Sequence, residues 1–71
     1  MSALTATPLA SAADALLQRK GHTLELWLLD RLDEGLSTAQ IADRLAAECD
    51  GIVAPSREAI RRWTNQLRPA A

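Results

Sequence analysis

Apolar side chains recur every three or four positions along this chain, which is the spacing of one face of an α-helix. The longest run lies between residues 24 and 36, where leucines share one broad face at about 100° per residue. These leucines are Leu24, Leu28, Leu29, Leu32 and Leu36. No stretch alternates apolar and polar residues for long enough to form a strand. The pattern predicts an all-α fold, a compact bundle of about four helices.

Capping residues and glycines mark the expected ends of the first two helices. Ser11 is expected to cap the first helix, and Gly21 is expected to stop it. Thr23 is expected to cap the second helix, which runs to about Glu34 and ends at Gly35. Each helix would therefore begin at a hydroxyl side chain and end at a glycine.

The last two helices carry similar signals. Ser37 and Gln40 have the S-x-x-Q spacing of a capping box, which predicts the start of the third helix, and Gly51 follows its end. Ser56, or the proline before it, opens a fourth helix that runs to about Leu67. The helical pattern therefore extends almost to the end of the chain.

The 71 residues are enough for one domain. Residues 1–10 are small and polar and are expected to form a flexible N-terminal arm. Residues 11–68 would be a single helical domain, and residues 69–71 a short tail. Ile52 and Val53 lie in the connection before the last helix and are expected to pack inward.

The charges of the chain are unevenly distributed. The net charge is −1, which by itself does not favour binding to nucleic acid. Residues 21–50 hold seven acidic side chains against two arginines, whereas residues 56–68 hold four arginines against one glutamate. A local basic patch of this kind can outweigh an acidic total.

The residue types give no support for catalytic or metal-binding chemistry. Cys49 is the only cysteine and His22 the only histidine, so the chain has no disulfide framework, no conventional zinc cage and no nucleophile–base pair. We expect no enzymatic activity, no cofactor and no bound metal. Cys49 is expected to be a small buried hydrophobe. Its isolation fits a reducing cytoplasm, and no stretch predicts a secretion signal or a membrane span.

The fourth helix separates two kinds of side chain. Its inner side is expected to hold Ser56, Ala59, Ile60, Trp63 and Leu67, with Trp63 in the core. Its outer side is expected to hold Arg57, Glu58, Arg61, Arg62, Asn65 and Arg68. Arginine can bond guanine through two hydrogen bonds, asparagine can bond adenine, and glutamate can accept from cytosine, while Arg62 and Arg68 are placed for phosphate contacts. The alternative is a solvated helix in which Glu58 pairs with Arg61 or Arg62.

Two segments in succession resemble a known DNA-binding pattern. The stretch GLSTAQIADRLAAE followed by VAPSREAIRRWTNQL resembles the bacterial and phage helix-turn-helix of small transcription regulators, resolvases and transposases. The first segment matches that pattern at Gly35, Ser37, Gln40, Ile41, Ala42 and Leu45. The second matches it at Ser56, Arg57, Ala59, Ile60, Arg62 and Trp63. The resemblance covers residues 23–68.

The resemblance implies a role for individual residues. Residues 56–68, beginning with Ser56, would be the recognition helix, with Arg57, Glu58 and Arg61 facing base edges and with Arg62 and Asn65 flanking them. Ser37, Thr38 and Gln40 would contact phosphate at the start of the third helix. The family's turn usually has about three or four residues. The residues AAECDGIVAP that separate Leu45 from Ser56 predict a longer third helix, an extended turn, or both.

These features predict a sequence-specific transcriptional regulator that binds double-stranded DNA. A homodimer is expected, because a single module gives limited affinity. Leu26 and Trp27, on either flank of the leucine stripe, are the expected dimer contacts, and Trp27 fits the core equally well.

The alternative is a small protein-interaction module, similar to phage factors that dock on RNA polymerase or on another regulator. The acidic residues 21–50 suit a basic protein partner and would be repelled by DNA. Such a module would show little or no preference for any DNA sequence.

Overall fold

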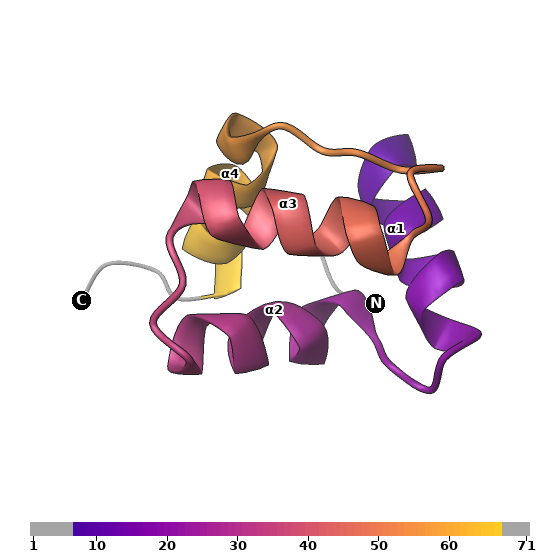
Figure 1. Ribbon diagram of the computed structural model, residues 1–71, viewed down its shortest axis with the longest axis horizontal. Coiled ribbons are helices and arrows are strands. Elements are labelled where there is room, and N and C mark those ends of the chain that lie inside the picture. Colours follow the sequence, from indigo (N-terminus) through magenta and orange to yellow (C-terminus); the bar gives the residue numbers. More distant parts are fainter. Residues whose placement is uncertain (1–6, 68–71) are drawn as a thin grey trace.

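The computed structural model describes residues 7–67, which fold into four α-helices (Figure 1). The helices are α1 (Pro8–Gln18), α2 (Leu24–Asp33), α3 (Thr38–Glu48) and α4 (Arg57–Leu67). Helix α1 packs against α2, and α4 packs against both α2 and α3. In Figure 1, α2 and α3 cross the molecule in opposite directions, with α1 at one end and α4 behind them at the other. The predicted all-α fold is confirmed.

Helix α1 begins earlier than the sequence predicts. Thr7, not Ser11, is the capping residue, because its Oγ1 accepts a hydrogen bond from the Ala10 N–H at 3.4 Å. Pro8 follows in the first helical position, where its fixed φ suits the helix and its missing N–H removes no helical hydrogen bond. Residues 7–10, expected in the flexible arm, therefore belong to the cap and first turn of α1, and Ala10 is fully buried. The rest of that arm and residues 68–71 lie outside the described residues.

Asp14 links α1 to the start of α2. Its Oδ1 accepts a hydrogen bond from the Leu24 N–H at 2.8 Å, and its Oδ2 accepts one from Gln18 at 2.6 Å. Thr23 caps α2 as predicted, since its Oγ1 accepts from the Leu26 N–H at 3.3 Å. Two side chains therefore satisfy amides in the first turn of α2.

Both ends of α3 are stabilised by local hydrogen bonds. The predicted capping box is present: Ser37 Oγ accepts from the Gln40 N–H at 3.2 Å, and Gln40 Oε1 accepts from the Ser37 N–H at 2.9 Å. At the other end, the N–H groups of Asp50 and Gly51 return to carbonyls in the last turn of α3, at 3.1 and 2.8 Å. This is the Schellman arrangement, and it places Asp50 at φ 55° and Gly51 at φ 76°.

The core lies where the four helices meet. Its largest fully buried side chains are Leu17, Leu24, Leu28, Ile41, Leu45 and Ile60. Trp63 is buried as expected, and Trp27 is only 3% exposed, so its indole is also part of the core. The buried Nε1 of Trp27 has no hydrogen-bond partner among residues 7–67, and the guanidinium of Arg31 lies 5.1 Å from the ring centroid.

The connection between α3 and α4 comprises residues 49–56 and is as extended as the sequence predicts. Val53 packs inward, but Ile52 is 72% exposed, which contradicts the expectation that both side chains are inside. Successive side chains of a non-helical segment tend to point to opposite sides, and Val53 takes the inner position. Helices in the described part of the chain all fall short of the length and apolar character that crossing a bilayer requires.

Candidate nucleic-acid interface

Helix α4 presents one buried and one exposed side. Ala59, Ile60, Trp63 and Thr64 are buried and Leu67 is half-buried. The exposed residues are Arg57, Glu58, Arg61, Arg62, Asn65 and Gln66. The separation predicted from the helical period is therefore present in residues 57–67. We call the exposed set the outer face of α4.

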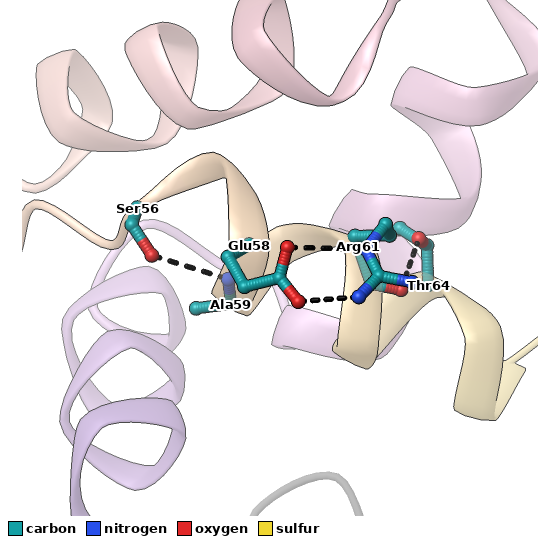
Figure 2. A network of polar contacts seen from close by, with 5 residues as sticks. All are labelled: Ser56, Glu58, Ala59, Arg61 and Thr64. Atoms are coloured by element: carbon teal, nitrogen blue, oxygen red, sulfur yellow. Dashed lines mark hydrogen bonds and ion pairs between the residues drawn. The ribbon is translucent and has the colours of Figure 1, made fainter.

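Thr64 was not identified from the sequence, although its spacing contains a signal. It follows Ile60 by four positions, so the two share the inner side of the helix. Its hydroxyl, in a residue that is only 7% exposed, donates to the Arg61 carbonyl at 3.1 Å. Thr64 therefore satisfies its own hydrogen-bonding group inside α4 and needs no partner from another helix (Figure 2).

The start of α4 is held by Ser56. Its Oγ accepts a hydrogen bond from the Ala59 N–H at 3.2 Å, as an N-cap does (Figure 2). Ser56 was expected on the inner side of the helix, but it is exposed, because it lies outside the helical turns that it caps. The cap places the exposed Arg57 and Glu58 in the first turn of the helix.

Glu58 and Arg61 form a pair with two hydrogen bonds on the outer face. Arg61 Nε donates to Glu58 Oε2 at 3.2 Å, and Arg61 Nη2 donates to Glu58 Oε1 (Figure 2). Both side chains remain more than half exposed. The hydrogen bond from Arg61, with the charges of Arg61, Arg62 and Arg57, lowers the pKa of Glu58, and the same pair raises the pKa of Arg61. Both groups are therefore ionised at neutral pH.

The outer face has an internal order. Arg57, Arg61 and Asn65 are spaced four residues apart and form one row along the helix. Arg62 lies to one side of this row, where it lines a shallow hollow together with Thr7 and Leu9 from the start of α1. The sequence did not predict that α1 borders α4 here. Arg57, Arg61 and Asn65 do not line that hollow, and all three are exposed.

The predicted phosphate contacts lie at the start of α3. The hydroxyl of Ser37 and the side-chain carbonyl of Gln40 are engaged in the capping box, whereas the Gln40 amide nitrogen has no bond within residues 7–67. Thr38 is half-buried. Since α3 packs against α4, both sets of predicted contacts lie on one pair of helices (Figure 1).

The two expected dimer contacts differ in accessibility. Leu26 is 61% exposed on α2, but Trp27 belongs to the core. Of the two positions that the sequence left open for Trp27, core or dimer contact, this structure has its side chain in the core, at 3% exposure. Its ring lies under the Arg31 guanidinium and lines a hollow together with Arg44, Ala47 and Glu48 of α3.

A second hollow lies between α2 and α3. It is lined by Trp27, Arg31, Arg44, Ala47 and Glu48. The hollow has side chains of both charges, Arg31 and Arg44 against Glu48. Two of these already have ion-pair partners outside it: Glu48 pairs with Lys20 at 3.2 Å, and Arg31 is bonded to Glu34. Among residues 7–67, no three His, Cys, Asp or Glu side chains are grouped in a way that could hold a metal ion.

Comparison of the chain with protein-family models, with curated proteins and with solved structures finds no match in any of the three. The arrangement of α3 and α4 and the chemistry of their exposed side chains are therefore the features that bear on function.

Proposed function

We propose that this protein is a sequence-specific DNA-binding regulator in which α3 and α4 act as a helix-turn-helix with an extended turn. Helix α4, within residues 56–68, is the recognition helix, and the start of α3 contacts the phosphate backbone. Arg57, Glu58 and Arg61 face base edges, and Arg62 and Asn65 flank them, with Arg62 on the backbone.

The observation that carries this proposal is the outer face of α4. Three arginines and one asparagine are exposed there, while the apolar side of the same helix is buried against α2 and α3. Long side chains with several donors, presented by a rigid helix, are suited to the major groove, which admits one α-helix. The acidic residues of the chain lie mainly in α2 and α3, so its net charge of −1 understates the positive charge of this face.

Selection from a random duplex library tests the proposal directly. The purified protein is mixed with the library, and the retained DNA is sequenced over several rounds. We expect enrichment of one motif. Protein that is folded and helical by circular dichroism, but that enriches no motif, would contradict the proposal.

A homodimer completes this proposal, because one helix in one groove gives limited affinity. Leu26 is the exposed apolar residue on α2 that a second copy would cover. We expect Leu26→Asp to lower affinity for a palindromic site at least tenfold and to leave affinity for a half-site unchanged. Sedimentation of both proteins, with and without DNA, measures the assembly. An unchanged affinity for the palindrome would remove Leu26 from the interface.

The second candidate function is a protein-interaction module, and the exposed apolar side chains favour it. Ile52 in the connection and Leu26 on α2 are both largely exposed. A protein partner such as RNA polymerase or another regulator would cover side chains of this kind. Absence of any motif in the selection would favour this function.

A further inference from the structure

The pairing of Glu58 with Arg61 determines which part of the guanidinium remains available. A guanidinium has five N–H donors in a fixed planar arrangement. Glu58 accepts from the edge formed by Nε and Nη2. The outer edge, formed by Nη1 and the second N–H of Nη2, makes no hydrogen bond within residues 7–67. That edge is a two-donor fork, suited to two acceptors that lie side by side.

We propose that Glu58 is a positioning residue that holds Arg61 so that its outer edge meets O6 and N7 of a guanine in the major groove. This inference rests on the proposed function and assigns one base of the site. Guanine is the base whose major-groove edge presents two adjacent acceptors. Because Glu58 already restricts the Arg61 side chain, less rotamer freedom is lost when the guanine binds.

The charge of Glu58 gives this arrangement a distinctive signature. A carboxylate on the outer face is repelled by phosphates of any sequence, so it weakens binding to all DNA. As a positioning group it also sharpens the preference for guanine. Removing Glu58 should therefore strengthen binding to random DNA and weaken discrimination. If the Glu58 carboxylate only stabilised the first turn of α4, its removal would weaken both the binding to random DNA and the discrimination between sequences.

The test compares wild-type protein with Glu58→Gln, Glu58→Asp and Arg61→Ala on the selected site. Each guanine of the site is replaced in turn by 7-deazaguanine, which pairs normally but lacks the N7 acceptor. At the contacted guanine, we expect this replacement to weaken wild-type binding about tenfold and Glu58→Gln binding only about two- to threefold. Glu58→Gln should bind a random duplex about two- to threefold more tightly than wild type.

Glu58→Asp separates charge from geometry, since it keeps the carboxylate but shortens the side chain by one methylene. It should bind random DNA as wild type does and still lose sensitivity to 7-deazaguanine. The double variant Glu58→Gln/Arg61→Ala should be no less sensitive to 7-deazaguanine than Arg61→Ala alone, because Glu58 and Arg61 act through one contact with the base. Circular dichroism checks that each variant is folded.

A measurement on the free protein distinguishes failure of this inference from failure of the proposed function. We expect the Arg61 Nε–H to exchange with solvent more slowly in wild type than in Glu58→Gln, as observed by NMR. Equal exchange rates would overturn the inference even if the selection enriches a motif. Full sensitivity of Glu58→Gln to every 7-deazaguanine, or a changed preference at a cytosine, would overturn it too. Slow exchange without any enriched motif would overturn the proposed function, and the inference with it.

Discussion

Glu58 has three arginines within reach on one short helix and bonds one of them. Arg61, three residues later, is the partner, and Arg57 and Arg62 contribute only through their charges. A glutamate can pair with an arginine that follows it by three or by four residues, so the spacing alone does not predict whether Glu58 bonds Arg61 or Arg62. The side-chain conformation seen in the structure makes the choice.

Glu58 should titrate at a lower pH than an ordinary glutamate. Its pKa is lowered in the folded protein, so any stability that the pair contributes is present above the ordinary carboxyl pKa and is lost as the pH falls through the lowered value. Carbon-13 NMR of the side-chain carboxyl measures this titration. In Arg61→Ala, the midpoint should move back toward the ordinary value. An unshifted midpoint in wild type would show that the pair does not persist in solution.

Cys49 should be unreactive in the folded protein. Burial raises the pKa of its thiol, with Lys20 opposing and Glu48 and Asp50 adding to the increase. The folded state therefore favours the neutral thiol. The stability that the folded protein has with a neutral Cys49 thiol is therefore fully present below the ordinary thiol pKa. It is lost as the pH rises through the raised pKa. We expect Ellman's reagent to label the native protein at pH 8 only as fast as the structure opens, and to label urea-unfolded protein at once. Fast native labelling would mean that the C-terminus of α3 opens locally.

The helix ends show both the strength and the limit of local sequence signals. Thr23, the Ser37–Gln40 box and Ser56 act as the sequence predicts, because a cap depends on neighbours within one turn. Thr7 was missed because the small polar residues around it are typical of a flexible arm. The packing of α1 against α2 orders that segment, and such packing is not visible locally.

Asp50 is an unusual residue for the position that it occupies. It adopts φ 55° at the end of α3, where glycine is the usual choice, and it is the only non-glycine residue with positive φ between residues 7 and 67. We expect Asp50→Gly to raise the free energy of unfolding by about 0.5–1 kcal/mol by removing the left-handed strain of a side chain. Urea denaturation measures the change. Asp50→Ala should be destabilised instead, and equal stability of the two variants would exclude backbone strain as the cause.

The four helices together share one small core, and much of what lies in it depends on contacts between elements. The helical period predicted that Ala59, Ile60 and Trp63 lie on the inner side of α4 and that Leu24 and Leu28 lie on the inner side of α2, although it placed Ser56 there as well and did not identify Thr64. It did not determine whether Trp27 is inside, because a side chain at the margin of an apolar stripe is buried only if another helix covers it. Ile52 and Val53 could not be distinguished for a similar reason, since a connection has no fixed period.

A core of this size should not tolerate the loss of one large side chain. Leu28 is fully buried, and its replacement by alanine should cost about 2–5 kcal/mol. A domain of this length is stabilised by only about 3–5 kcal/mol. We therefore expect Leu28→Ala to be largely unfolded at 37 °C in thermal circular dichroism. Leu26→Ala, two positions away on the same helix but exposed, should change stability by less than about 0.5 kcal/mol. Cooperative melting of Leu28→Ala near the wild-type temperature would contradict the assigned core.

The two sides of α4 have a consequence for evolution. Ala59, Ile60, Trp63 and Thr64 hold the helix in the fold, and none of them belongs to the outer face. Mutations at Arg57, Glu58, Arg61 or Asn65 therefore encounter little selection for foldability. Under the proposed function, a few codon changes on the outer face would alter the base preference of α4 while its buried residues stay constant. Under the same proposal, a duplicated gene would change its DNA target without passing through an unfolded intermediate.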